Sequence, residues 1–240
     1  MSAGAWDSHA DWWAENFSDG ADPEYAEQIL PLVEAHIGDA AVVVDIGCGE
    51  GQVSRAAAGR GCTTVGLDPA AGQLATAVAK GGGAGYVRAS AAALPLADGC
   101  ADVAVACLVL EHVGDLAAAI DEAGRVLRLG GHLLVVLNHP IVQTPGSGWV
   151  DDHIIDPPEQ YWQLGWYLDE RSVTEQVDGG VFIEFHHRPL SRYVNAAAAA
   201  GMLLEHMEEP APPPGFVARA PEYVEQVRMP RVMFLSFVRA

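Results

Sequence analysis

A short glycine-rich segment carries the residues best suited to ligand chemistry. Asp45 ends an apolar run, and Gly47, Gly49 and Gly51 follow at intervals of two residues, before helix-forming residues begin at Gln52. Glycine lets the backbone turn tightly and approach a ligand, and the start of a helix offers unpaired N–H groups. The order strand, glycine loop, helix is therefore typical of the first crossover of a nucleotide-binding α/β domain.

The spacing of these glycines separates two kinds of nucleotide. The dinucleotide fingerprint places its third glycine three residues after the second, and its pyrophosphate needs no acid nearby. Here the interval is two residues, and an acid precedes the loop. The segment resembles motif I of class I S-adenosylmethionine (SAM) dependent methyltransferases, whose cofactor carries a sulfonium and an ammonium group. The resemblance implies that Asp45, Gly47, Cys48 and Gly49 bind this cofactor.

A second acid supports the same ligand. Asp68 lies 23 residues after Asp45, directly after the apolar run 63–67. An acid at the end of that strand can accept hydrogen bonds from both hydroxyls of a ribose. In the methyltransferases that the loop resembles, the next residue often packs against adenine, which assigns that contact to Pro69.

A third segment also resembles these enzymes. Ser90-Ala91-Ala92-Ala93-Leu94-Pro95-Leu96, followed by the acids and glycine of 98–102, is similar to a stretch of the large methyltransferase group that includes ubiquinone-biosynthesis enzymes. That group has an acid that binds the adenine amino group where this chain has Ser90. Adenine recognition is therefore expected to depend on Ser90 and on backbone groups at Ala91.

The segment after the fourth apolar run would meet the reacting end of the cofactor. By the resemblance, Leu108 holds the methionine part of SAM through its backbone, and Glu111 and His112 lie near the transferred methyl. Methyl transfer is an in-line displacement, so it needs a base only when the acceptor must lose a proton. His112 and His186 are the candidates for such a base. Packing or surface roles suffice for His9, His36, His132 and His206.

These residues need a scaffold that brings strand ends together. Apolar runs at 42–46, 63–67, 86–89, 102–108 and 132–137 alternate with helix-forming stretches at 52–59, 71–80 and 116–127. This alternation predicts a parallel sheet with helices on both faces. A helix at 191–200 and two final strands, 203–207 and 233–238, would add an antiparallel edge hairpin. The expected fold is α/β, Rossmann-like and seven-stranded, as in class I methyltransferases.

The chain is expected to form one domain with four parts. Residues 1–39 form an N-terminal helical cap, 40–137 the SAM-binding core, 138–190 a lid insertion, and 191–240 the C-terminal helix and edge hairpin. Residues 138 to about 180 show no long periodic segment, yet they are rich in aromatic residues and acids, which argues against disorder. A lid of this composition would suit a cationic or amine acceptor, but a solvated face is the better explanation of the acids.

Composition narrows the class of partner. Thirteen basic and thirty-two acidic residues give a net charge of −19, which opposes binding to nucleic acid. No apolar run is long enough for a membrane span, and no charged-then-apolar leader opens the chain. The four cysteines show no metal-ligand spacing, so no metal site is expected. Their scattered positions, together with the lack of a leader, predict a cytoplasmic location.

The leading hypothesis is SAM-dependent methyl transfer to an oxygen, nitrogen or carbon acceptor of a small molecule, with S-adenosylhomocysteine as product. A non-catalytic SAM-binding or regulatory module of the same fold is an alternative, as is a protein or nucleic-acid methyltransferase. A nicotinamide-dependent reductase is disfavoured by the glycine spacing and by the absence of a Tyr-x-x-x-Lys pair. Monomer and homodimer both remain open.

Overall fold

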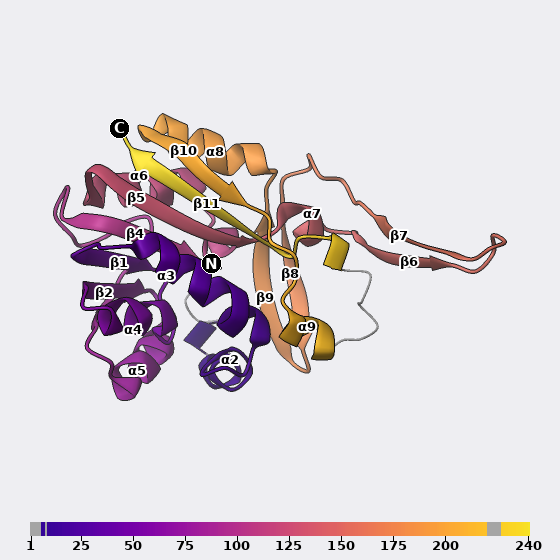
Figure 1. Ribbon diagram of the computed structural model, residues 1–240, viewed down its shortest axis with the longest axis horizontal. Helices are drawn as coiled ribbons and strands as arrows, with labels where there is room; N and C mark the ends of the chain where they lie inside the picture. Colours follow the sequence, from indigo (N-terminus) through magenta and orange to yellow (C-terminus); the bar gives the residue numbers. More distant parts are fainter. Residues whose placement is uncertain (1–5, 8, 220–226) are drawn as a thin grey trace.

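A seven-stranded sheet forms the centre of the computed structural model, which describes residues 6–7, 9–219 and 227–240 (Figure 1). The strands are β1 (Val42–Ile46), β2 (Thr63–Asp68), β3 (Gly85–Arg88), β4 (Ala101–Cys107), β5 (Leu127–Asn138), β10 (Met202–Glu208) and β11 (Val232–Arg239). Their order across the sheet is β10-β11-β5-β4-β1-β2-β3. Strands β1 to β5 are parallel, and β11 runs antiparallel to both β5 and β10. The predicted fold class is confirmed.

Parts of the two terminal segments lie outside this description. The predicted cap, 1–39, includes residues 1–5 and 8, and the predicted C-terminal segment, 191–240, includes residues 220–226, none of which the structure describes. The helices that are described are α2 (Ala10–Phe17), η1 (Tyr25–Ile29), α3 (Leu30–Ile37), α4 (Gln52–Gly59), α5 (Ala71–Lys80), η2 (Leu110–His112), α6 (Leu116–Val126), α7 (Pro140–Gln143), α8 (Leu190–Ala199) and α9 (Pro214–Arg219).

Alternating side chains of the central strands form two separate cores. Val43 is fully buried on one face, in a cluster with side chains of η1, α3 and α4. Val44 points to the opposite face, into a cluster with side chains of α6 and α8. Successive residues of a strand point to opposite faces, so an apolar strand buried on both sides needs a helical layer on each. This arrangement leaves the carboxyl ends of β1, β2 and β4 free to form a site.

The segment 24–37 is helical throughout, as its sequence predicts, and contains one π-helical turn, η1, that continues directly into α3. Ile29 and Leu30, at the junction, both have right-handed helical dihedrals. Pro31 lies in the first turn of α3, and its missing N–H is accommodated by the wider turn before it. Tyr25, in η1, lies against the sheet, and its hydroxyl lies 3.5 Å from the Cys107 sulfur.

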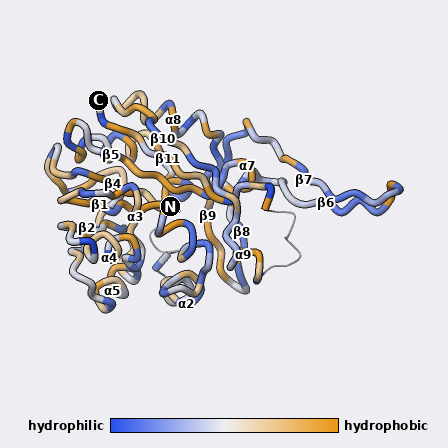
Figure 2. Tube along the Cα trace, in the orientation of Figure 1, coloured by the Kyte–Doolittle hydropathy of each residue, from blue (hydrophilic) through white to orange (hydrophobic). Residues whose placement is uncertain are grey.

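Two antiparallel hairpins occupy the segment after β5, where the sequence predicted no long periodic structure. They are β6 (Gly148–Asp152) with β7 (Glu159–Gln163), and β8 (Arg171–Asp178) with β9 (Val181–His187). The first extends away from the body of the molecule (Figure 1) and is mostly hydrophilic along its length (Figure 2). The Trp149 and Trp162 rings meet edge to face across it at 5.7 Å. Cross-strand aromatic pairs of this kind stabilise a hairpin, which accounts for part of the aromatic content of the segment.

None of the helices in the described part of the chain has the length and apolar character needed to cross a bilayer.

We expect Phe237→Ala to destabilise the sheet strongly. Phe237 lies on β11, is 1% exposed and packs in the core that includes α6 and α8. Removing a buried phenyl ring leaves a cavity and should lower the free energy of unfolding by about 3–5 kcal/mol, as measured by urea denaturation. Phe182→Ala is the matched control, because Phe182 is 50% exposed and should cost less than about 0.5 kcal/mol. Equal losses in both variants would contradict this account of the core.

Candidate functional site: a cavity at the carboxyl ends of the parallel strands

A cavity of about 400 Å³ lies where β1, β2 and β4 end. Its volume falls within the range of small-molecule sites, and its position is the one at which open α/β sheets bind ligands. Four segments far apart in the sequence contribute to its wall, namely the N-terminal segment, the loop after β1, the end of β2 with the residues after β3, and the segment after β4. The residues involved are Trp6, Trp13, Tyr25, Gly47–Gln52 apart from Gly51, Asp68, Pro69, Gln73, Ser90–Ala92, Cys107–Val109 and His112–Asp115.

Backbone N–H groups of the glycine loop hold it against the end of β2. Gly47 and Cys48 both donate N–H groups to the Leu67 carbonyl, at 2.7 and 3.0 Å, and Gly49 donates to the Asp68 carboxylate at 3.0 Å. These donors are consequently already used inside the protein and do not form a cradle for a phosphate. The loop instead presents close-packed backbone to the cavity, which supports the exclusion of a dinucleotide that its spacing predicted.

Only glycine fits at the first position of this loop. Gly47 has a φ of +71°, and a Cβ added there would overlap the side chain of Val109. The left-handed conformation and the close approach of the Val109 side chain together disfavour any residue but glycine. The loop therefore lies flat against the segment after β4, so that the loops after β1 and β4 form one continuous wall.

The two predicted acids have different surroundings. Asp68 lines the cavity, and its two oxygens accept N–H groups from Gly49 and Ala70. Asp45 does not line it. It is 1% exposed and accepts a 2.6 Å hydrogen bond from the Ser54 hydroxyl. Burial raises the pKa of Asp45 to about 7, partly offset by the Ser54 hydrogen bonds, and also raises the pKa of Asp68. Asp45 is therefore a buried residue that joins the end of β1 to α4, whereas Asp68 faces the cavity and is available to a ligand.

Glu50 was not among the predicted site residues, yet it joins three parts of the site. It is 1% exposed and forms ion pairs with Arg55 at 2.7 Å and Lys80 at 3.0 Å. Its other oxygen accepts a 2.9 Å hydrogen bond from Ser18, which follows α2. A buried carboxylate is stable only when it is paired and hydrogen-bonded in this way. Sequence reasoning had no means of finding this contact, because its partners are 5, 30 and 32 residues away.

The N-terminal segment closes one side of the cavity with aromatic rings. Trp6 and Trp13 meet edge to face at 5.4 Å, and Trp6 also meets the His112 ring at 5.2 Å. Asp7 anchors this segment by accepting the Gly72 N–H at the start of α5, at 2.8 Å. The resemblance had assigned a covering role to the N-terminal helix, and these contacts support that expectation for the described residues.

The predicted lid does not reach the cavity wall. Among the residues that the structure describes, none from 138–190 lines this cavity, and the β6–β7 arm extends away from the body (Figure 1). The insertion contacts the site indirectly through β9, because the Glu184 carbonyl and the Phe185 ring both lie against His112. Among the described residues, Trp6 and Trp13 of the N-terminal segment line the cavity instead.

The backbone after β4 has an unusual conformation at Leu108. Its φ is +52°, and its N–H donates to the Val136 carbonyl at 2.8 Å. A non-glycine residue in this region carries strain, and such residues concentrate at functional sites. Leu108 lines the cavity, as do Pro69, Ser90 and Ala91. The Ser90 hydroxyl lies in a tight turn and accepts the Ala92 N–H at 3.3 Å.

The two candidate bases are in different cavities. His112 is 4% exposed and lines the cavity of the glycine loop, whereas His186 lines a neighbouring cavity bounded by Arg171 and Arg192. His112 Nδ1 lies 2.8 Å from the Glu184 carbonyl, which can only accept, so Nδ1 carries the proton and Nε2 has a lone pair. Burial lowers the pKa of His112 to about 4, so its ring is neutral at physiological pH.

Glu111 is buried beneath the cavity and does not line it. Its Oε1 accepts hydrogen bonds from the backbone N–H and the side-chain amide of Asn138, at 3.2 and 2.9 Å. Its Oε2 has no partner among the described residues. Burial raises the pKa of Glu111 to about 7. Glu111 fastens the η2 turn to the end of β5, so of the two residues expected near the transferred methyl only His112 lines the cavity.

The fold and the cavity together define a class of protein. The strand order, the flat glycine loop after β1, the acid at the end of β2 and the strained residue after β4 are the features of a class I methyltransferase that binds SAM.

Comparison with known proteins supports this class. Residues 44–135 match the family model described as a methyltransferase domain. An uncharacterized methyltransferase of Mycobacterium sp. (strain JLS) is 40% identical over 106 residues, which are 44% of this chain and 41% of the relative. A malonyl-[acyl-carrier protein] O-methyltransferase of Serratia marcescens is 32% identical over 127 residues, 52% of this chain and 49% of the relative. The matches thus span less than half the length of these curated relatives.

A solved structure extends the likeness to most of the chain. The S-adenosylmethionine dependent methyltransferase of Mesorhizobium loti superposes with a TM-score of 0.73 and 29% identity, covering 91% of this chain and 98% of that one. Residues 44–135 therefore match a methyltransferase domain, and the fold over most of the chain is that of SAM-dependent methyltransferases, whose cofactor is SAM.

We expect Glu111→Gln to stabilise the protein at pH 8 and to have little effect at pH 4. The folded-state pKa of about 7 is raised above the ordinary value, so the unfolded chain loses this proton first. The cost of burying Glu111 therefore grows as pH rises from about 4 to 7 and is then constant. The neutral glutamine avoids a cost of about 1–3 kcal/mol, measurable by urea denaturation at both values of pH. Glu205→Gln, on exposed β10, serves as control. A Glu111→Gln variant with the same pH dependence as the parent would contradict the assignment.

Proposed function

We propose that this chain transfers the methyl group of SAM to a small-molecule acceptor that binds beside His112. The observation that carries the proposal is the convergence of Gly47–Gly49, Asp68–Pro69, Ser90–Ala91 and Leu108 on one cavity. These four segments follow the neighbouring strands β1, β2, β3 and β4, whose carboxyl ends the parallel sheet brings to one edge, where open α/β sheets bind ligands.

The cavity has the chemistry that SAM requires. Gln73 is 2% exposed, lines the cavity, and has an Oε1 without a hydrogen-bond partner among the described residues, which suits a ligand that donates a hydrogen bond. Trp6, Trp13 and Tyr25 contribute aromatic faces, and such faces attract cations. We assign the ribose hydroxyls to Asp68, the adenine to Pro69, Ser90 and Ala91, and the methionine part to the Leu108 carbonyl, with Asp45 acting beneath the loop.

When bound, SAM supplies an electrophilic methyl group on a positively charged sulfur. The residues of the chain then have three tasks. The N-terminal aromatic segment excludes water, the glycine loop fixes the position of the reacting centre, and His112 orients the acceptor. Displacement at a sulfonium is accelerated chiefly by such positioning, and no covalent intermediate with the protein is required.

The protonation state of His112 indicates which class of methyl acceptor the site suits. A ring with a pKa of about 4 is a weak base, but its Nε2 accepts a hydrogen bond at every pH above about 5. This suits a methyl acceptor that has an O–H or N–H to donate to Nε2 and that is nucleophilic without a strong base, such as a phenol or a neutral amine, more than an ionised carboxylate, which has no hydrogen to donate. The relative from Serratia marcescens is named for O-methylation of malonyl-acyl carrier protein, which is consistent with an oxygen acceptor. Ubiquinone-type enzymes remain the wider group to which we assign the chain.

A non-catalytic SAM-binding module is the alternative that the same cavity permits. The neutral Nε2 of His112 at the cavity wall favours an enzyme, because a purely regulatory site has no use for a free acceptor at the methyl end. Turnover of labelled SAM with a panel of small carboxylic acids, amines and phenols separates the two. We propose that residues 1–240 form one methyltransferase domain and that its substrate is not a nucleic acid. Analytical ultracentrifugation would distinguish a monomer from a homodimer.

We expect Asp68→Ala to weaken binding of S-adenosylhomocysteine by about 10–100-fold, because a charged acceptor for the ribose and an anchor for the loop are lost together. Isothermal titration calorimetry measures the change. Asp121→Ala, on the exposed face of α6, should bind as the parent does. If neither the parent nor the control binds S-adenosylhomocysteine at millimolar concentration, the proposed function fails.

We expect His112→Ala to lower kcat by about 10²-fold or more and His186→Ala to lower it much less. The reason is that His112 alone of the two lines the cavity of the glycine loop. The pH profile of the parent should show no limb from this histidine between pH 6 and 9, because its pKa is about 4. A larger effect of His186→Ala would exchange the roles of the two residues.

A further inference from the structure

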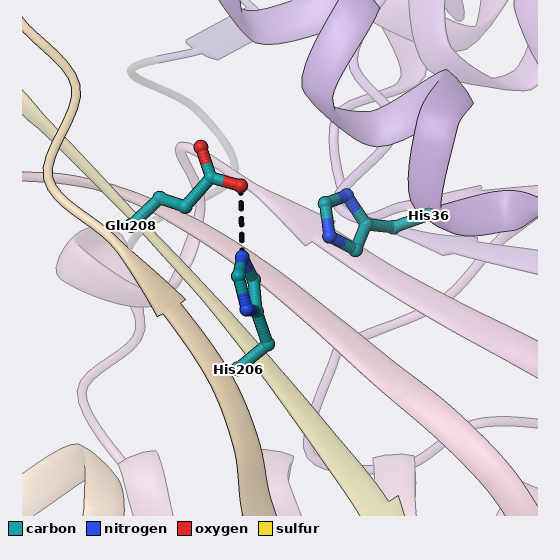
Figure 3. A group of neighbouring side chains, drawn as sticks. All are labelled: His36, His206 and Glu208. Atoms are coloured by element: carbon teal, nitrogen blue, oxygen red, sulfur yellow. Dashed lines mark hydrogen bonds and ion pairs between the residues drawn. The ribbon is translucent and has the colours of Figure 1, made fainter.

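Two histidines and a glutamate meet outside the cofactor cavity. His36 lies in the last turn of α3, and His206 and Glu208 lie on the edge strand β10 (Figure 3). Their ligand atoms all lie within 4.8 Å of one another. The sequence indicated no metal site, and it assigned His36 and His206 to packing or surface roles. The tertiary structure brings together a helix and a strand that are 170 residues apart.

The alternation of the strand places both β10 residues on one face. His206 and Glu208 are two residues apart, so their side chains project to the same side of β10, towards α3. His206 Nε2 lies 2.8 Å from Glu208 Oε1. The His36 ring stacks against the His206 ring at 5.2 Å and packs on Phe234 of β11 at 4.3 Å. The His36 ring on α3 thus faces His206 and Glu208 on β10.

His36 is already oriented as a metal ligand. Its Nδ1 lies 2.8 Å from the Leu32 carbonyl, which can only accept a hydrogen bond, so Nδ1 carries the proton. Nε2 therefore has a lone pair, and Figure 3 shows the ring turned with its Nε2 towards His206. A backbone carbonyl that fixes the second nitrogen in this way is the usual outer-shell support of a histidine ligand.

We propose that His36, His206 and Glu208 bind a divalent transition-metal ion of the Zn²⁺ type. Two imidazole nitrogens and one carboxylate, with a fourth position open to water, form a common zinc donor set. Tetrahedral ligands at about 2.0–2.2 Å lie about 3.3 Å apart. His206 Nε2 and Glu208 Oε1 are already closer than this, and small rotations of these accessible side chains bring His36 into range. On binding, the metal replaces the proton at His206 Nε2, and that proton moves to Nδ1.

This ion would act as a structural link and not in methyl transfer. In the sheet, β10 is separated from β1 by β11, β5 and β4, a distance of about 19 Å at the usual spacing of strands. The ion joins α3 to the sheet edge, and α3 continues directly from η1, which carries the cavity residue Tyr25. Metal binding therefore stabilises the helical layer on which one wall of the cofactor cavity depends.

The test is titration of the EDTA-treated full chain with ZnCl₂ by calorimetry, together with thermal unfolding. We expect one equivalent to bind with a micromolar dissociation constant, and saturating Zn²⁺ to raise Tm by about 5 °C. Co²⁺ substitution adds a spectroscopic readout, since nitrogen and oxygen ligands give visible bands without a thiolate charge-transfer band. That band would reveal binding to a cysteine such as the exposed Cys100 instead.

Matched variants make the result specific. His206→Gln and His36→Gln should each weaken Zn²⁺ binding by about tenfold or more, with circular dichroism to check the fold. His132→Gln is the control, because His132 forms a comparable 3.0 Å pair with Glu205 that is not part of the three-residue cluster. No binding at 100-fold excess Zn²⁺ over protein, or equal binding by His206→Gln and His132→Gln, would overturn the proposal. Binding of S-adenosylhomocysteine is measured in parallel, so failure here leaves the proposed function intact.

Discussion

The site depends on how closely the loop after β1 fits against its neighbours. On one side the loop donates two hydrogen bonds to the Leu67 carbonyl, and on the other it lies so near Val109 that Gly47 has no room for a side chain. This fit sets the positions of the ends of β1, β2 and β4 relative to one another. It also uses the N–H groups of Gly47, Cys48 and Gly49, so these groups do not form an anion cradle in the cavity.

The closure of the cavity depends on a buried acid within the same loop. Glu50 accepts a hydrogen bond from Ser18 and pairs with Arg55 and Lys80, so the N-terminal segment is tied to the core through one carboxylate. Two cations and a hydroxyl compensate for its burial, whereas a lone buried carboxylate would be costly. The aromatic wall of Trp6 and Trp13 is held in place as a consequence. Glu50 therefore joins the loop after β1 to the N-terminal segment that covers the cavity.

Burial distributes charge unevenly along the cavity. Asp68 lies at the end of β2, where its carboxylate is stabilised by two backbone N–H groups. At the opposite end, His112 is neutral because burial lowers its pKa to about 4. Nearby acids that face away from the cavity, Asp45 and Glu111, have pKa values raised to about 7. Of the acids that line the cavity, Glu50 is paired with Arg55 and Lys80, and Asp115 accepts the Ala118 N–H at the start of α6. Asp68 is therefore the acid that we assign to the ligand.

Local sequence determined the elements and the cofactor. Period-two and period-3.6 patterns located the core strands and helices to within a few residues, and the interval of Gly47, Gly49 and Gly51 with Asp68 named SAM, because these signals depend on neighbours in the chain. Strands β6, β7 and β8 were missed, since they are mostly exposed and show no buried periodicity, whereas the apolar run 181–185 predicts a strand where β9 lies. Only the tertiary structure showed that Asp45 lies under the loop, that His186 faces another cavity, that Glu50 ties the cap to the core, and that His36 meets His206 and Glu208. Each of these depends on contacts between residues distant in sequence, which no local pattern records.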